Sequence, residues 1–145
     1  MLTQAKIQTN IVYKHLEKSN SKIIVEQGGT RSGKTYNILL FIIFNYCTNN
    51  KGKIVTICRK TFPSLRATVL RDFLYILRHH QMYREDFHNK SNSEYNLFGN
   101  LIEFTSLDQS QKIRGRKRDL LFINEANELH WEDWQQLIFR TQERI

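Results

Sequence analysis

Two glycines, a lysine and a threonine stand at fixed spacing within one eight-residue segment. Residues 28–35 fit the pattern G-x-x-x-x-G-K-[ST] at every fixed position and read Gly28, Gly29, Thr30, Arg31, Ser32, Gly33, Lys34 and Thr35. Gly28 and Gly33 allow strained backbone dihedrals, so that N–H groups can turn inward around phosphate oxygens. Lys34 supplies a positive charge for the β and γ phosphates, and the Thr35 hydroxyl is suited to ligate Mg²⁺. The pattern predicts a P-loop that binds ATP and Mg²⁺, with all eight residues as nucleotide contacts.

A second candidate for chemistry follows a continuous apolar run. Residues 120–123 are Leu, Leu, Phe and Ile, and Asn124 and Glu125 come next. This arrangement resembles a Walker B element, in which Glu125 would polarise the attacking water as a general base. Aspartate is usual at position 124, whereas the amide of Asn124 can hold a metal only through bound water and adds no charge. Metal affinity would then depend more on Thr35 and the phosphates. The structural alternative for Glu125 is an exposed carboxylate at a strand end.

The surrounding segments predict the elements that position these residues. Residues 21–26 predict a short buried strand entering the loop, and residues 35–47 predict a helix leaving it, so that the phosphates lie at a helix N-terminus. Strands are also expected at 53–58 and 119–123, a β-hairpin at 95–104, and helices at 4–18, 64–77 with Ser64 as N-cap, and 131–142. Continuous apolarity in the last strand implies burial on both faces. The prediction is an α/β, three-layer P-loop NTPase fold with a mostly parallel sheet.

Length and composition limit the class of protein. A chain of 145 residues with 40% hydrophobic and 25% charged residues is typical of one globular domain. The longest apolar run, at 38–44, is too short to span a bilayer, and the N-terminus lacks a signal-peptide core. Cys47 and Cys58 form no C-x-x-C pair. We expect reduced core thiols and a cytosolic setting.

The charge of the chain is strongly positive. Lys and Arg number 22 against 14 Asp and Glu, for a net charge of +8. This excess suits a polyanionic partner such as DNA. The densest basic cluster contains Lys112, Arg114, Arg116, Lys117 and Arg118. Three interpretations of it remain open at this point: a solvated loop before a strand, a contact with DNA phosphates, or a charge donated to ATP.

The combination of these segments resembles the N-terminal ATPase domain of the large terminase subunit of tailed bacteriophages. The resemblance covers nearly the whole chain, and the P-loop alone is much less specific than the combination. The similar segments are the helix at 12–16, the loop at 28–35 with its internal arginine, the second-strand segment at 59–66, the hairpin end and basic loop at 102–108 and 112–115, and the Walker B version at 124–129.

The resemblance implies an ATPase of the additional-strand, catalytic-glutamate type that drives double-stranded DNA into a preformed capsid. Lys34 and Thr35 would hold phosphate and Mg²⁺, Glu125 would activate water, and Arg31 would lie near the γ-phosphate. Arg114 is the candidate for a finger that reaches the ATP of a neighbouring subunit. The alternative for Arg114 is a DNA-backbone contact or a surface arginine.

The resemblance also implies partners and a location. The partners are double-stranded DNA, the portal protein, the small terminase subunit and the procapsid, with a ring homo-oligomer and no membrane, in the cytoplasm of the infected bacterial host. Residues 1–145 are expected to be an ATPase domain that is incomplete at its C-terminus, without the coupling segment, closing strands and nuclease domain of the family, so no nuclease activity is expected. Two alternatives remain: another P-loop enzyme such as a RecA-like helicase or a small kinase, and a non-catalytic nucleotide- or DNA-binding module, which Asn124 favours.

Overall fold

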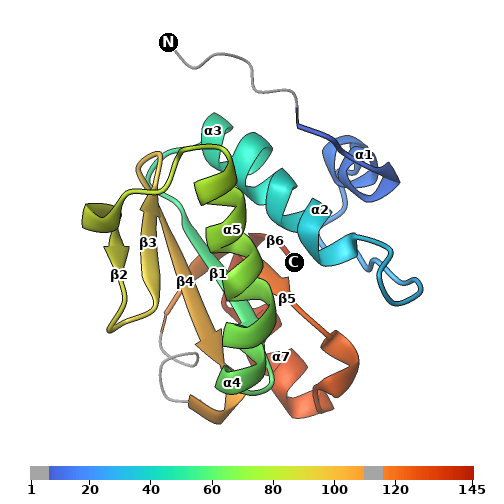
Figure 1. Cartoon of the computed structure of the whole chain (residues 1–145). Helices are drawn as coiled ribbons and strands as arrows, with labels where there is room; N and C mark the ends of the chain where they lie inside the picture. The colour runs from blue at the N-terminus through green and yellow to red at the C-terminus, as the bar shows by residue number, and fades with distance from the viewer. Residues whose placement is uncertain (1–6, 110–115) are drawn as a thin grey trace.

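A six-stranded sheet forms the centre of the molecule in a computed structural model that describes residues 7–109 and 116–145 (Figure 1). The strand order is β2-β3-β4-β1-β5-β6. The strands are β1 (Ile54–Arg59), β2 (His88–Asn89), β3 (Glu94–Leu97), β4 (Asn100–Ser106), β5 (Arg118–Ile123) and β6 (Thr141–Arg144). Strand β1 pairs in parallel with β4 and β5, and β5 pairs in parallel with β6, whereas β3 is antiparallel to both β2 and β4. The prediction of an α/β fold with a mostly parallel sheet is confirmed.

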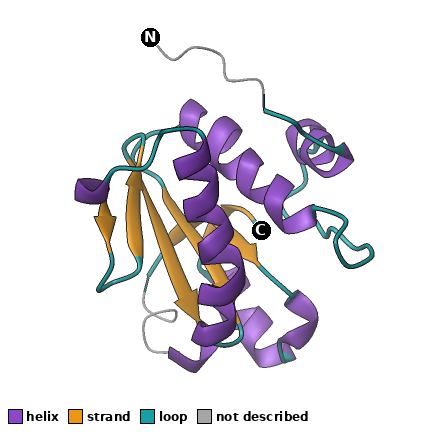
Figure 2. Ribbon diagram, in the orientation of Figure 1, coloured by secondary structure: helices purple, strands orange, loops and turns teal. Residues whose placement is uncertain are grey.

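Helices lie on both faces of this sheet (Figure 2). The α-helices are α1 (Ile11–Lys18), α2 (Lys34–Phe41), α3 (Cys47–Asn49), α4 (Phe62–Leu65), α5 (Arg71–His79) and α7 (Trp131–Phe139). Two π-helical turns, η1 (Ile42–Tyr46) and η2 (Arg66–Leu70), continue α2 into α3 and α4 into α5. Short 3-10 turns are η3 (Glu85–Phe87), η4 (Leu107–Gln109) and η5 (Ala126–Glu128). Thr61, not Ser64, is the N-cap of α4, because Pro63 already lies in the first helical turn, where its missing N–H costs nothing.

The alternation of side chains along β1 and β5 divides the core into two parts. Val55 and Ile57 of β1 pack into the larger cluster together with α1, α2 and α5. Cys58, next along β1, points to the opposite face, where it packs with Leu121 and with Leu137 of α7. The apolar run of β5 is therefore continuous because both of its faces are buried, as expected. Strand β1 is also buried on both faces, although Thr56 interrupts its apolar residues.

The segment before the loop differs from the prediction of a short buried strand at 21–26. These residues form no strand of the sheet, and Ile23 and Val25 are 45% and 73% exposed. Only Ile24 packs against the larger core cluster. Two backbone hydrogen bonds hold the segment beside the end of β6, from Ile24 N to Ile145 O at 2.9 Å and from Ile145 N to Lys22 O at 2.8 Å. An extended segment with two such bonds buries one side chain, and the apolar residues on either side stay in solvent.

The end of the chain also differs from its prediction. The helix expected at 131–142 ends at Phe139, and Thr141–Arg144 form strand β6. Arg118 N donates to Arg140 O at 3.0 Å, and the side chain of Thr141 is buried and donates to Leu137 O. Pairing with β5 therefore ends the helix. A short strand follows this helix.

Two further sequence expectations can be compared with the structure. The antiparallel pair β3 and β4 meets at Phe98 and Gly99, within the range predicted for the hairpin. Cys47 and Cys58 are buried free thiols, and burial raises the pKa of each to about 12.

Within the described residues, no helix combines the length and the apolar character that crossing a membrane requires.

Candidate functional site

The loop at residues 28–35 leads into the N-terminus of α2. Gly33 is the N-cap of α2 and has φ +72°, which glycine adopts without the steric cost of a Cβ. Arg31 has φ 65°, a left-handed conformation that is uncommon outside glycine. Strained residues of this kind gather at functional sites, where the surrounding structure enforces them. The loop therefore contains two residues with left-handed backbone conformations, Arg31 and Gly33.

The amine of Lys34 lies within the curve of this loop. Its Nζ donates to Gly28 O at 2.8 Å, Gly29 O at 2.8 Å and Ser32 Oγ at 2.9 Å. A Cβ at Gly28 would stand 3.7 Å from Lys34 Cδ, so the backbone passes close to the lysine side chain. The three acceptors use all three donors of the ammonium group and fix the charge inside the loop.

Two asparagines that the sequence reasoning missed brace the loop from outside. The backbone N–H of Asn10 donates to Asn37 Oδ1 at 2.9 Å, and Asn10 Nδ2 donates to Ser32 O at 3.2 Å. Asn37 Nδ2 donates in turn to Gly33 O at 3.0 Å. Asn10 also caps α1, because its Oδ1 accepts from Val12 N. The predicted helix at 4–18 placed Asn10 inside the helix, whereas α1 begins at Ile11 and Asn10 is its N-cap. The contact of Asn10 with the loop is visible only in three dimensions.

Removal of this brace should loosen the loop without unfolding the domain. For Asn37→Ala we expect a loss of about 1–3 kcal/mol of stability, because the Asn10 N–H loses its acceptor. ATP affinity should fall as the loop becomes less ordered. Thermal unfolding and nucleotide titration measure the two effects. Asn49→Ala, at an exposed helix end, is the control; equal losses in both variants would contradict a specific brace.

One hydrogen bond joins the loop to the end of β5. Asn124 Nδ2 donates to Thr35 Oγ1 at 3.1 Å, and Asn124 N donates to Cys58 O at 2.9 Å in the sheet. Asn124 is 6% exposed. Its Oδ1 is buried and has no hydrogen-bond partner among the described residues, which is an unusual state for an amide oxygen. The predicted metal-site residues Thr35 and Asn124 are therefore in contact.

The oxygens of this pair fit a hard cation. Mg²⁺ prefers oxygen ligands and keeps several waters or substrate phosphates in its coordination sphere. The hydroxyl of Thr35 and the unpartnered amide oxygen of Asn124 provide two neutral oxygens. No group of three or more His, Cys, Asp or Glu side chains that could hold a metal occurs within 7–109 and 116–145. These two neutral oxygen ligands suit a Mg²⁺ ion that is also coordinated by phosphate oxygens, rather than a metal held by protein side chains alone.

Glu125 follows directly and has a strained backbone. Its φ of 57° and ψ of 58° are left-handed, and its side chain is exposed to solvent. Its carbonyl accepts from Glu128 N at 3.0 Å in turn η5. Of the five described non-glycine residues with positive φ, Arg31 and Glu125 are the two that the sequence assigned to the site. This coincidence favours a functional role for Glu125 over a simple strand-end carboxylate.

An ion pair that the sequence did not single out holds the turn after Glu125. Arg59, at the end of β1, donates to Glu128 through NH2 at 3.1 Å and Nε at 3.4 Å. Its NH1 donates to Thr68 Oγ1 of η2 at 3.0 Å. The half-buried guanidinium thus connects three elements around η5. We assign Arg59 a positioning role for the segment that carries Glu125.

The predicted basic cluster is only partly described. Lys112 and Arg114 lie outside the described residues. Arg116 and Lys117 are exposed, and Arg116 pairs with Glu103 at 2.9 Å. Arg118 is 1% exposed within β5, so it does not belong to a surface cluster, contrary to the sequence interpretation. Its NH1 donates to Leu137 O at 3.5 Å.

Comparisons with known proteins point to one family. The family model described as "Terminase large subunit, T4likevirus-type, N-terminal" matches residues 27–144. The fold is similar to the large terminase of a thermophilic bacteriophage, with a TM-score of 0.72, 15% identity, and coverage of 90% of this chain and 36% of that chain. The same terminase in complex with ADP gives a TM-score of 0.72 and 17% identity, over 90% of this chain and 35% of that one. No curated protein matches the chain. The chain spans about a third of the length of these solved structures.

Proposed function

Because the chain belongs to the T4likevirus-type family of terminase large subunits and matches its N-terminal model, we propose that it is the ATP-hydrolysing motor domain for packaging double-stranded DNA into procapsids. The observation that carries this proposal is the 3.1 Å hydrogen bond from Asn124 to Thr35, since it joins the loop to the strand end that bears Glu125. The ADP complex of the similar terminase from the thermophilic bacteriophage supports a nucleotide as the ligand.

In this proposal residues 28–35 bind the phosphate chain of ATP. The amine of Lys34 gives up its hydrogen bonds to the carbonyl oxygens of Gly28 and Gly29 and donates to the β- and γ-phosphate oxygens instead. The exchange is favourable because charged phosphate oxygens accept stronger hydrogen bonds than carbonyl oxygens do. The N-terminus of α2 adds free N–H groups and the positive end of its dipole. Asn10 and Asn37 keep the loop in shape while this exchange occurs.

Thr35 and Asn124 are the residues that would hold Mg²⁺, the second directly or through water. When bound, Mg²⁺ neutralises charge on the β and γ oxygens and so stabilises the transferring phosphoryl group. Both protein ligands are neutral, so the phosphate oxygens supply the anionic contacts. Metal and nucleotide should therefore bind together.

Glu125 is assigned the activation of water. Its carboxylate orients the attacking water and accepts its proton as the water oxygen bonds to the γ-phosphorus and the bond to the β–γ bridging oxygen breaks, which releases ADP and phosphate. The exposed position of the side chain leaves it accessible to solvent. Arg59 and Glu128 hold the turn that follows, which limits how far Glu125 can move.

Further roles follow from membership of the family. Arg31, which is exposed at the tip of the loop, is assigned to the γ-phosphate. Arg114 is assigned as a finger that acts on the ATP of a neighbouring copy in a ring. The partners are double-stranded DNA, the portal protein, the small terminase subunit and the procapsid, in the cytoplasm of an infected bacterium.

Phosphate release from Mg-ATP by the full chain, with and without linear duplex DNA, tests the proposal. Hydrolysis that requires Mg²⁺ and rises with DNA is the expected result. Tight nucleotide binding without turnover would instead identify the non-catalytic module that Asn124 favours. Separation of DNA strands in the absence of capsid proteins would identify a helicase.

The neutral residue at position 124 leads to a testable metal dependence. Asn124→Asp places a carboxylate beside Thr35 Oγ1 and should lower the Mg²⁺ concentration for half-maximal ATP binding by about tenfold, the size of effect typical of groups around a metal. A Mg²⁺ titration of nucleotide binding measures the shift. Asn127→Asp adds the same charge at an exposed position nearby. The same shift in both variants would remove Asn124 from the metal site.

A further inference from the structure

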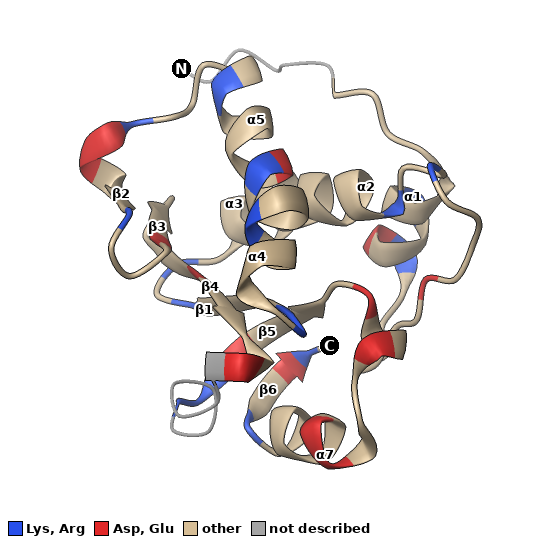
Figure 3. Ribbon diagram, turned by 60° about the horizontal axis from the view of Figure 1, so that its bottom comes forward, with Lys and Arg blue, Asp and Glu red and all other residues tan. Residues whose placement is uncertain are grey.

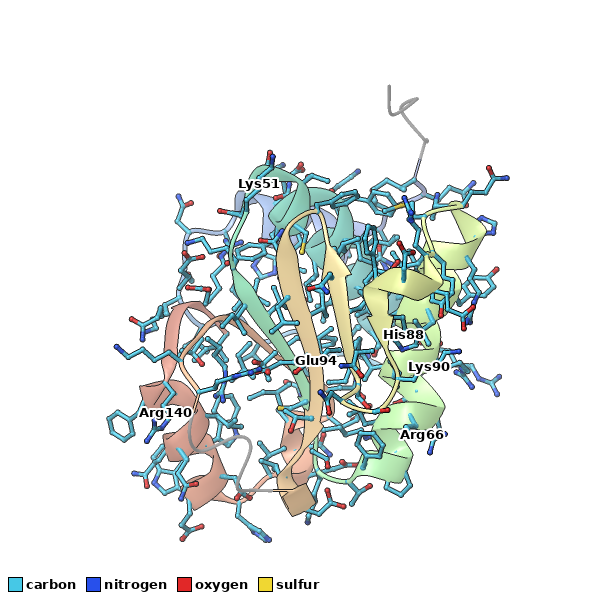
Figure 4. All side chains as sticks on the ribbon, turned by 90° about the vertical axis from the view of Figure 1, so that its left-hand side faces the viewer. Lys51, Arg66, His88, Lys90, Glu94 and Arg140 are labelled. Carbon is cyan, nitrogen blue, oxygen red and sulfur yellow. The ribbon has the colours of Figure 1, made fainter. Side chains whose placement is uncertain are left out.

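One surface pocket lies away from the candidate nucleotide site. It is a groove of about 910 Å³ between the continuous helix α4–η2–α5 and the antiparallel strands β2 to β4. No residue of 28–35, and neither Asn124 nor Glu125, lines it. Figure 4 shows its labelled residues Arg66, His88, Lys90 and Glu94 on one side of the molecule, next to the helix and the strands.

The groove carries an excess of positive charge. Its lining contains five cationic side chains against the two carboxylates Glu94 and Glu103; the cations are Arg66, Arg71, Arg78, Lys90 and Arg116. Arg116 already pairs with both carboxylates, at 3.5 and 2.9 Å. Burial, followed by the charges of Lys90 and Arg78, lowers the pKa of His88, so that this histidine is neutral at neutral pH. Figure 3 shows the basic positions of α5 well apart from the acidic ones of α7.

The remaining cations are available to an outside anion. Within 7–109 and 116–145, Arg71 pairs only with the adjacent Asp72, at 3.3 Å, and Lys90 pairs with Glu85 at 2.7 Å, both in exposed pairs. Such surface pairs contribute little stability, so a phosphate can replace the carboxylate. Arg78 stacks 4.4 Å from the ring of Tyr83, which orients its guanidinium without neutralising it. Arg66 is exposed and has no carboxylate partner within the described part of the chain.

The positions of these groups suit an extended polyanion. Arg66 and Arg78 both line the groove and are twelve residues apart along the continuous helix, a separation of at most about 18 Å at the α-helical rise, because the π-helical turn η2 is shorter per residue. One DNA strand advances about 3.4 Å per phosphate, so this separation spans at most about five phosphates. The opposite wall ends in Lys90, Ser91, Asn92 and Ser93, whose hydroxyl and amide groups are common donors to phosphate and sugar oxygens.

We propose that this groove binds the sugar-phosphate backbone of DNA, with the α4–η2–α5 helix on one side of the strand and the turn at residues 90–93 on the other. The choice of DNA as the polyanion rests on the proposed packaging function. The groove is distinct from the ATP site, so the two proposals can fail separately. Recognition is through phosphates, and binding is therefore independent of sequence.

Binding of a fluorescent duplex of arbitrary sequence by the full chain tests this proposal. The groove variant Arg66→Gln with Lys90→Gln is compared with Lys51→Gln with Arg140→Gln, which removes two exposed charges of the same kind outside the groove (Figure 4). The groove variant should bind about tenfold more weakly, and its slope of log K against log salt should fall by about 1.8, for two lost phosphate contacts. The control should retain the slope of the unmodified chain.

Equal losses of DNA affinity in the two variants would overturn the proposal that the groove binds DNA, because they would reflect only the change in net charge. Unchanged DNA binding in the groove variant would also overturn it, and if that variant lost affinity for a poly-glutamate peptide instead, the groove would belong to an acidic protein. Binding of Mg-ATP is measured in the same variants. Normal ATP binding together with unchanged DNA binding in the groove variant would contradict DNA binding by the groove and leave the proposed nucleotide site intact. Loss of ATP binding in Lys34→Ala with DNA binding retained supports the separation of the two sites.

Discussion

Replacement of Glu125 by glutamine is expected to reduce ATP hydrolysis by about 10²- to 10⁴-fold, the contribution typical of a general base. The amide of glutamine has nearly the same shape as the carboxylate but cannot accept a proton from water. The turn should be preserved, because the backbone bond from Glu128 N to Glu125 O does not involve the side chain. ATP affinity should therefore remain unchanged. Steady-state phosphate release and equilibrium nucleotide binding measure the two quantities separately.

The control for this result is Glu132→Gln, which removes an exposed carboxylate in the first turn of α7. Its hydrolysis rate should equal that of the unmodified chain. If Glu125→Gln turned over ATP at the normal rate, Glu125 would have no part in the chemical step. If it lost nucleotide binding as well, Glu125 would act on the shape of the site rather than on water.

Replacement of Lys34 by alanine is expected to weaken ATP binding by about 100-fold, equivalent to the roughly 2–3 kcal/mol of a hydrogen bond to a charged group. The variant loses the cation that stands inside the loop between Gly28 O, Gly29 O and Ser32 Oγ. Because it also loses these three bonds, the loop should become more mobile. Titration with a fluorescent ATP analogue measures the affinity.

A matched control is Lys14→Ala, which removes an exposed lysine from α1 without touching the loop. Its affinity for ATP should be that of the unmodified chain. Circular dichroism should show the same helix content in both variants, since Lys34 is not part of the buried core clusters. Equal affinity of Lys34→Ala and the unmodified chain would rule out the loop as the phosphate site.

The local features of the site were predictable because they depend on spacing and on strand burial. The pattern at 28–35 indicated a loop followed by a helix, and Gly33 is the N-cap of that helix. The continuous apolar run in β5 indicated a parallel strand buried on both faces. The resemblance of the segment at 120–125 to a Walker B element placed Asn124 near the loop, and Asn124 Nδ2 donates to Thr35 Oγ1 at 3.1 Å.

The features that the sequence missed depend on contacts between distant residues. Residues 21–26 have the composition of a buried strand, yet the segment is joined to the end of β6 by two backbone bonds with Ile145, and Val25 stays exposed. Strand β6 is polar, and it forms because β5 offers a free edge, which no local propensity reveals. Asn10 and Arg59 are ordinary polar residues in the sequence, and their roles as braces arise from the fold alone.

The central claim is that residues 28–35 and the end of β5 form one nucleotide site. Hydrogen–deuterium exchange of the full chain, with and without Mg²⁺ and a slowly hydrolysed ATP analogue, tests it most directly. The account predicts protection of peptides that cover residues 28–36 and 120–128 together, with no such protection in Lys34→Ala. Protection of neither segment, or protection of one without the other, would contradict a shared site.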